Sequence, residues 1–175
     1  MHRIIRPVEL QDRHTPRLAR WLLGKVLVRT LDGERQAGVI TEVEAYHGEN
    51  DLACHASKGR TARTDVMYRS GGRWYVYLCY GVHEMLNLVT GPAGHPAAVL
   101  IRGLDIVGGP GRLTQRLKID RRLNGAPATP ASGLHLEDHG IRLPRGRVRR
   151  GPRIGVDYAG PVWAARPWRF WVGKL

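Results

Sequence analysis

Two carboxylates two residues apart, followed by a phenol, form the part of this sequence best suited to acid–base chemistry. Glu42, Glu44 and Tyr46 alternate with smaller side chains in the segment Gly38–Tyr46. Side chains of an extended strand alternate between its faces, so this spacing predicts both carboxylates and the ring on one face. A polar loop follows and delivers His55 nearby. A solvated sheet face also explains the pattern, because glutamates are mostly exposed in folded proteins.

The elements around these carboxylates must position them. A strand over Lys25–Thr30, the turn Asp32-Gly33 and the strand Gly38–Tyr46 predict a hairpin. The alternation places Ile40 on the same face as the glutamates. A helix is expected before the hairpin, with Thr15 as its cap, Pro16 at its first position and Gly24 after its end.

A second hairpin is predicted over Arg73–Thr90, with its turn near Tyr80-Gly81. Tyr75 and Tyr77 fall on one face of its first strand. A large ring at a hairpin tip suits insertion between stacked bases. The alternative is that aromatic residues are simply good strand formers, which accounts well for Tyr75 and poorly for Tyr80.

Two arginines further along carry candidate roles. Ala97–Ile101 is predicted as a buried strand that ends in Arg102, which is either a snorkelling strand-end charge or a site residue. Gly108–Arg112 opens a predicted helix over Leu113–Ile119, and its N-terminal amides together with Arg112 can hold a phosphate.

Charge is the strongest global signal. Lys and Arg number 28 against 15 Asp and Glu, a net charge of +13, and only four of the basic residues are lysines. This balance predicts a polyanionic partner, most often a nucleic acid, and arginine pairs with phosphate through two hydrogen bonds. The alternative is a compositional bias toward arginine. Six arginines within residues 142–153 form either a phosphate-facing arm or a solvated strand pair.

The composition of the chain, 42% hydrophobic and 25% charged, predicts a folded protein. The hairpins predict a mixed α/β (α+β) fold: one compact domain over residues 1–175 with a curved, largely antiparallel sheet flanked by helices. No apolar run is long enough for a bilayer and no secretory signal is evident. We therefore expect no membrane association, a cytoplasmic location (with the nucleoid if the source is bacterial), and a monomer.

Several motifs together resemble one family. They are Thr-Glu-Val-Glu-Ala-Tyr-His-Gly (41–48), His55, Tyr-Val-Tyr-Leu-Cys-Tyr-Gly-Val-His (75–83) with Asn87, Leu-Leu-Gly-Lys (22–25), Val-Leu-Ile-Arg (99–102), Gly-Pro-Gly-Arg-Leu-Thr-Gln (109–115) and Arg-Ile-Gly-Val (153–156). In this order, across nearly the whole chain, they resemble the alkyladenine (3-methyladenine) DNA glycosylase family. The resemblance implies a monofunctional enzyme that flips alkylated or deaminated purines out of duplex DNA and excises them in base excision repair.

The resemblance also implies roles for single residues. Glu44 corresponds to the general base that activates water, and Arg102 to the group that helps to hold this water. The walls and hydrogen-bonding edge of the base pocket correspond to Tyr46, His55 and Tyr77. Further, Tyr80 corresponds to the residue that fills the gap left by the flipped nucleotide, and Asn87 to the group that disfavours normal guanine.

Elementary chemistry is consistent with one essential carboxylate. A purine alkylated at N3 or N7 is already cationic and leaves without full protonation, so one glutamate that activates water and offsets positive charge at C1′ is enough. Strand geometry alone does not separate Glu42 from Glu44. A lyase needs an amine nucleophile, and none of the four lysines lies in this constellation, so simple hydrolysis without a cofactor is expected.

Two rival functions remain open. One is a metal-dependent hydrolase that uses His47, Cys54, His55, Cys79 or His83, although these residues lack the spacing of zinc ligands and we expect no metal. The other is a non-catalytic domain that binds DNA or RNA through its arginines.

Overall fold

Antiparallel strands organise the computed structural model, which describes residues 2–144 and 146–173. The strands are β1 (Arg3–Ile4), β2 (Val26–Leu31), β3 (Glu34–His47), β4 (Trp74–Cys79), β5 (His83–Val89), β6 (Ala97–Leu104), β7 (Val107–Gly108), β8 (Leu134–Asp138), β9 (Arg149–Gly151) and β10 (Arg169–Trp171). The helices are α1 (Thr15–Leu22), α2 (Pro110–Arg116) and α3 (Gly160–Ala164). Short 3-10 turns lie at Pro7–Leu10, His55–Lys58, Asp65–Tyr68, Arg121–Leu123, Pro130–Ser132 and Asp157–Ala159.

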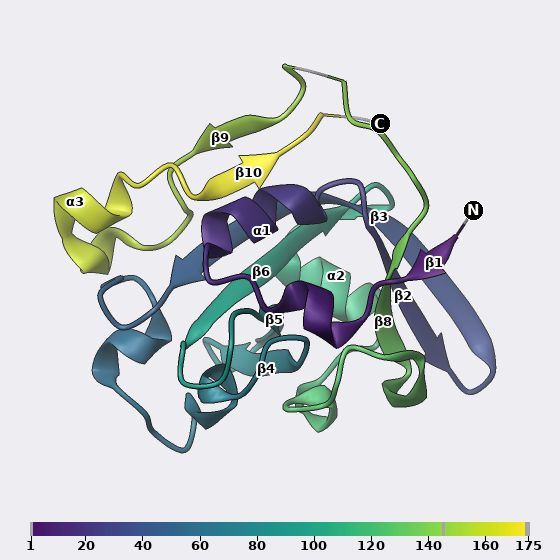
Figure 1. Ribbon diagram of the computed structural model, residues 1–175, viewed down its shortest axis with the longest axis horizontal. Helices are drawn as coiled ribbons and strands as arrows, with labels where there is room; N and C mark the ends of the chain where they lie inside the picture. The colour runs from purple at the N-terminus through teal and green to yellow at the C-terminus, as the bar shows by residue number, and fades with distance from the viewer. Residues whose placement is uncertain (1, 145, 174–175) are drawn as a thin grey trace.

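The strands join in one antiparallel sheet, whose main path runs β1-β8-β2-β3-β6-β5-β4. β10 pairs with β3 on one side and with β9 on the other. The short strands β9 and β10 lie side by side at the top of Figure 1. Helices α1 and α2 pack on the sheet strands, and α3 leads into β10 at the left of Figure 1. The predicted mixed α/β fold with a largely antiparallel sheet in a single domain is confirmed.

Both predicted hairpins form. Asp32 and Gly33 have φ angles of 52° and 81°, the left-handed pair that joins two strands tightly. The second hairpin joins β4 to β5, with Tyr80 (φ 50°) and Gly81 (φ 68°) at its turn. Gly81 tolerates its φ because it has no Cβ, whereas Tyr80 adopts an uncommon conformation for a large side chain.

A double irregularity in the β3–β6 pairing changes the predicted faces. Ile40 pairs with Leu104 and Glu42 with Gly103, but Val43 then pairs with Ile101. The strict alternation of β3 is therefore broken, and Ile40 packs in the same core as Val43, not on the carboxylate face. The prediction for Ile40 is wrong because an extra residue in a strand reverses the alternation beyond it.

The same irregularity sets the place of Arg102. This residue is skipped between the Gly103 and Ile101 pairs, and β6 continues past it to Leu104. The prediction that the buried strand ends at Arg102 is therefore wrong. Strand bulges are common beside active sites, where they redirect a side chain.

The two faces of the sheet have different surroundings. One face packs on the main core, which includes Trp74, Val76, Leu86, Leu88, Val99 and Ile101 together with side chains of α1 and α2. Residues that alternate with these, such as Tyr75, Tyr77, Asn87 and Leu100, face a cavity. The same holds for β3: Val43 and Ala45 pack in the main core, whereas Glu44 and Tyr46 face the cavity.

The helix boundaries differ from those predicted at two places. His14 caps α1 through its Nδ1, which accepts a hydrogen bond from the Arg17 backbone N–H at 3.1 Å. Thr15 is not the cap: it is the first helical residue, is fully buried, and its hydroxyl lies 3.2 Å from that of Thr90. Helix α2 begins at Pro110, three residues before the predicted start, because proline suits the first turn of a helix.

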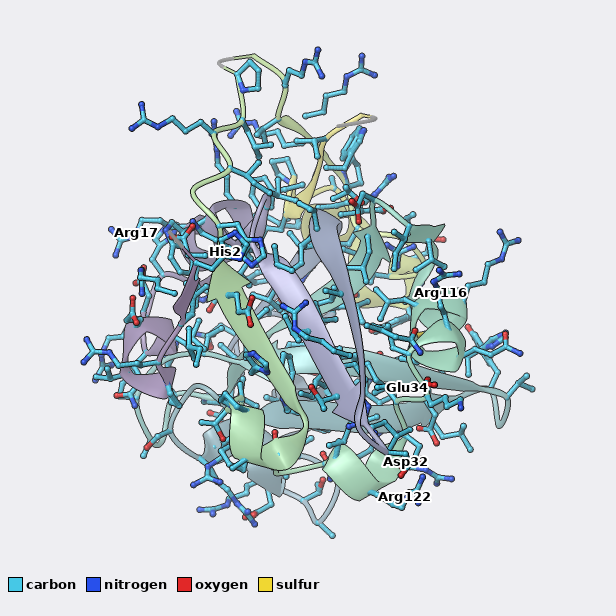
Figure 2. The ribbon with its side chains drawn as sticks, turned by 90° about the vertical axis from the view of Figure 1, so that its right-hand side faces the viewer. His2, Arg17, Asp32, Glu34, Arg116 and Arg122 are labelled. Atoms are coloured by element: carbon cyan, nitrogen blue, oxygen red, sulfur yellow. The ribbon has the colours of Figure 1, made fainter. Side chains whose placement is uncertain are left out.

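Much of the positive charge lies on the outside of the protein. Figure 2 shows the side chains of Arg17, Arg116 and Arg122 extending outward from the periphery. In the arginine-rich segment, Arg149 and Arg150 are exposed on β9, which favours the solvated-strand alternative there, and Arg145 lies outside the described residues. Of the helices in the described part of the chain, none is both long and apolar enough to cross a membrane.

Candidate active site

A cavity of about 920 Å³ opens on the face of the sheet that is opposite the main core. Its volume lies within the range of about 300–1,000 Å³ that small-molecule sites occupy. Seven of the eight predicted site residues line it: Glu44, Tyr46, His55, Tyr77, Tyr80, Asn87 and Arg102. Residues from β3, the 3-10 turn His55–Lys58, the β4–β5 hairpin and β6 therefore converge on one cavity. We call this cavity the aromatic pocket because three tyrosines of β3 and β4 (Tyr46, Tyr75 and Tyr77) contribute to its wall.

The carboxylate of Glu44 is buried and held at both oxygens. Its Oε2 accepts a hydrogen bond from the Tyr46 hydroxyl at 2.8 Å, and its Oε1 accepts one from the backbone N–H of Ile154 at 2.7 Å. The Glu44 side chain has no exposed surface. Burial raises the pKa of Glu44, and the nearby charge of Arg102 partly offsets this effect. A raised pKa makes the ionised carboxylate a stronger proton acceptor.

Glu42 shares the face of Glu44 but has a different environment. Its Oε1 accepts hydrogen bonds from Nε of Arg102 at 3.0 Å and from Nε of Arg169 at 2.7 Å. The Glu42 side chain is 23% exposed. Arg169, on β10, lies directly opposite Glu44 in the sheet register. Glu42 is therefore bridged by two arginines, whereas Glu44 is held by a phenol, a backbone amide and one arginine.

Aromatic rings in mutual contact form the wall of the pocket. The ring centroids of His55 and Tyr77 are 4.6 Å apart in an edge-on arrangement, and those of Tyr75 and Tyr77 are 5.3 Å apart. Nδ1 of His55 lies 2.9 Å from the Tyr75 hydroxyl. Burial lowers the pKa of His55 to about 4, with a further contribution from the charge of Arg63. The imidazole is therefore neutral at physiological pH and can donate or accept a hydrogen bond.

Asn87 and Tyr80 occupy contrasting positions. The Asn87 side chain is buried, and its Nδ2 donates to the backbone carbonyls of Tyr75 at 3.2 Å and Met85 at 3.3 Å. These two bonds hold the amide in one orientation at the pocket wall. Tyr80 is 92% exposed at the hairpin tip beside the pocket mouth. Its ring contributes almost nothing to the core.

Arg112 lies apart from the other predicted site residues. It is exposed on α2, and the residue of this helix that lines the pocket is Pro110. Helix α2 has seven residues, so its dipole offers little to an anion. Any contact of Arg112 with DNA would be made outside the pocket.

Sequence reasoning missed the groups that fix the strand carrying Glu44. Arg153 forms an ion pair with Asp51 at 2.6 and 2.9 Å, and both side chains are fully buried. Arg153 also donates to the Ala45 carbonyl at 2.9 Å, and its guanidinium lies 4.8 Å from the centroid of the Tyr46 ring. The next residue supplies the Ile154 amide to Glu44. The motif Arg-Ile-Gly-Val at 153–156 marked this segment in the sequence, but no local pattern shows that it bonds to Glu44, Ala45 and Asp51.

In the described part of the chain, the residues of the metal-dependent alternative form no group of three whose ligand atoms lie close together. His55 is bonded to Tyr75, and His47 Nδ1 lies 3.0 Å from the Thr15 hydroxyl. Burial raises the pKa of the Cys54 thiol to about 12, so it stays protonated and is a poor metal ligand. Within the described residues, a different trio, His2, Glu137 and His139, has its ligand atoms close together. The Glu137 carboxylate is already bonded to His135, His139 and Arg35, an arrangement complete in itself.

The sequence matches a model of the methylpurine-DNA glycosylase family over residues 9–108 and 104–174. A "putative 3-methyladenine DNA glycosylase" of Myxococcus xanthus is 50% identical over 165 residues, covering 89% of this chain and 83% of that protein. Proteins of the same name from Methanocella arvoryzae and Legionella pneumophila are 47% and 41% identical. These alignments cover 94% and 98% of this chain, and 90% and 95% of the respective relatives. The match confirms the predicted DNA glycosylase of alkylated purines in base excision repair, and the chain belongs to the methylpurine-DNA glycosylase family.

Proposed function

We propose that this glycosylase binds a flipped purine in the aromatic pocket and hydrolyses its N-glycosidic bond with water activated by Glu44. The proposed substrates are the alkylated bases 3-methyladenine and 7-methylguanine and the deaminated base hypoxanthine. One observation carries the assignment: the buried Glu44 carboxylate is held at both oxygens in the wall of a cavity that aromatic rings line.

Glu44 serves as the general base in this scheme. Attack on C1′ requires a water that loses a proton as the carbon gains oxocarbenium character. The carboxylate accepts this proton and offsets the positive charge at the sugar. Arg102 lies 3.5 Å from Glu44 Oε1, close enough to help orient the water and to keep the carboxylate ionised despite its burial. Glu42 is not assigned this role, because it does not line the pocket and its Oε1 is shared by Arg102 and Arg169.

The pocket wall provides the recognition. Electron-rich tyrosine rings attract a cationic alkylated base through cation–π interaction. Neutral His55 can hydrogen-bond the edge of the base. Asn87, held in one orientation by two carbonyls, occupies the space that the exocyclic amine of a normal guanine needs. The contact with Asn87 disfavours purines that carry a C2 amine. 7-Methylguanine also carries this amine, but its cationic ring offsets the penalty through attraction to the tyrosine rings and easier departure from C1′.

Extraction of the base needs a compensating contact in the duplex. Unstacking a nucleotide costs about a few kcal/mol. Tyr80 projects from the hairpin tip at the mouth of the pocket, so its ring is placed to fill the gap that the flipped nucleotide leaves. The exposed arginines supply phosphate contacts. The seven predicted site residues that line the pocket all belong to one chain, so the site needs no second copy to be complete, and this supports action as a monomer.

The experiment is a base-release assay on duplex DNA with a single 7-methylguanine or hypoxanthine. We expect free base and an intact strand that breaks only after alkaline treatment, the product of a monofunctional enzyme. A covalent adduct trapped by borohydride would instead indicate a lyase. Tight binding to lesion DNA without base release would favour the non-catalytic alternative.

A further inference from the structure

The positively charged side chain of Arg63 lies at the wall of the aromatic pocket. Arg63 lies in the loop between the 3-10 turns His55–Lys58 and Asp65–Tyr68 and lines the pocket. Its guanidinium carbon is 5.1 Å from the centroid of the Tyr77 ring. The cation therefore faces the same ring that a bound purine would contact.

Arg63 differs from the other arginines of its loop. Arg60 and Arg69 both form ion pairs with Asp65, at 2.7 and 2.9 Å. Among the ion pairs of the described residues, Arg63 takes part in none, so its charge is not neutralised by a neighbouring carboxylate. The charge acts on the pocket: it contributes to the lowered pKa of His55 and opposes the rise that burial causes in the pKa of Tyr75.

The proposed substrates differ in the charge that a nearby cation would sense. A purine alkylated at N3 or N7 carries a positive charge and leaves as a neutral molecule. Hypoxanthine is neutral in the nucleotide and leaves as an anion unless it is protonated. Glu44 cannot protonate the leaving group while it acts as the base, and His55, with a pKa of about 4, carries no spare proton at neutral pH. Neutral lesions therefore need another source of stabilisation.

We propose that Arg63 is a specificity-determining residue that favours excision of neutral purines over cationic ones. The proposal rests on the function proposed above for the pocket. The guanidinium stabilises the purine anion as it departs, which is electrostatic stabilisation of charge that develops in the transition state. The same guanidinium repels a base that enters with a positive charge and competes with it for the face of Tyr77.

The reaction balances without a further reactant. The C1′–N9 bond of deoxyinosine breaks with its electron pair on the purine, while water oxygen bonds to C1′ and its proton passes to Glu44. The hypoxanthine anion, stabilised by Arg63, then takes a proton from solvent, and Glu44 returns its proton to solvent. With 7-methylguanine the electron pair neutralises the ring, so no anion forms and Arg63 has nothing to stabilise.

The test compares two lesions in one enzyme series. Single-turnover rates are measured with the full chain on hypoxanthine and 7-methylguanine, each opposite cytosine in the same duplex sequence. Variants are Arg63→Gln, Arg63→Lys and the matched loop control Arg60→Gln, which removes the same charge from a residue that does not line the pocket. The readout is the ratio of the two rates, which a general loss of DNA affinity or of folding does not change.

We expect Arg63→Gln to lower the hypoxanthine to 7-methylguanine ratio by at least about tenfold, the effect of losing one modest electrostatic contact in the transition state. Arg63→Lys should restore most of the ratio, and Arg60→Gln should leave it unchanged. Equal losses on both lesions would show that Arg63 contacts phosphate and would overturn the proposal. Absence of base release from either lesion by the unmodified protein would refute the proposed function itself, and this inference with it.

Discussion

Arg102 lies closer to Glu42 than to Glu44. Its Nε is 3.0 Å from Glu42 Oε1 and 3.5 Å from Glu44 Oε1, and Arg169 approaches Glu42 from the other side at 2.7 Å. Glu42 thus anchors the arginine, and the arginine in turn stands beside the buried carboxylate. The two glutamates share a strand face but differ in environment: Glu42 is partly exposed and bridges two arginines, whereas Glu44 is buried and lines the pocket.

Substitution of the proposed base should stop the chemistry and spare binding. Glu44→Gln keeps the shape of the side chain, but an amide does not accept a proton from water. We expect base release to fall by about 10²–10⁴-fold or more, the usual contribution of general base catalysis. Affinity for lesion-containing duplex, measured by fluorescence anisotropy, should change little. Glu42→Gln is the matched control and should lose much less, so comparable losses in both variants would contradict the assignment.

The pH dependence of the reaction follows from the raised pKa of Glu44. A general base must be ionised, so activity is lost as the pH falls through the pKa of Glu44. Because burial raises that pKa above 4.5, the acid limb of kcat/KM should have its midpoint above 4.5. The charge of Glu42 also raises it, so Glu42→Gln should move the limb to lower pH. The measurement uses 7-methylguanine, whose ring charge does not require protonation, and a limb that moves to higher pH in Glu42→Gln would contradict this account.

Asn87 should govern the exclusion of normal guanine. Asn87→Ser opens the space beside the purine C2 position, so slow release of undamaged guanine should become detectable while hypoxanthine release persists. The loss of the hydrogen bonds to Tyr75 and Met85 should also lower the free energy of unfolding by about 1–3 kcal/mol. Both quantities are measurable, by base release and by urea unfolding. Unchanged guanine exclusion in a folded variant would place selectivity elsewhere in the pocket.

Tyr80 tests the mechanical part of the reaction. If its ring fills the gap in the duplex, Tyr80→Ala should lower excision of well-paired lesions by roughly ten- to a hundred-fold, corresponding to about 1.4–2.7 kcal/mol. A lesion in a bulge is already unstacked, so its excision should lose far less. The melting temperature should hardly change, because the ring is 92% exposed. Equal losses on paired and bulged lesions would remove Tyr80 from the DNA interface.

The buried Arg153–Asp51 pair should be a major determinant of stability. Arg153→Met leaves the Asp51 carboxylate buried without its partner, which costs about 3–5 kcal/mol. In a domain of this size that corresponds to a fall in melting temperature of roughly 6–20 °C. The exposed Arg149→Met is the control and should shift the melting temperature by only a degree or two, within about 0.5 kcal/mol. Similar shifts in the two variants would show that the buried pair is not important to the fold.

Local periodicity in the sequence was enough to predict the strands and turns that carry the site. Alternation placed Glu42 and Glu44 on one face, and turn residues placed Tyr80 at a hairpin tip; both features depend on neighbours within a few positions. The motifs then indicated the family, because they combine residue type and order over nearly the whole chain.

Strand geometry left the two glutamates equivalent and the resemblance favoured Glu44, but only the tertiary structure shows how their environments differ. The amide that holds Glu44 belongs to Ile154, 110 positions away, and the second arginine on Glu42 is Arg169, 127 positions away. Arg102 is skipped in the β3–β6 register, and the alternation of β3 is broken at Ile40. Both irregularities arise where two strands pair, so no local pattern encodes them. Burial and hydrogen bonding between distant segments determine which carboxylate is protected from bulk water, and only the folded chain brings those segments together.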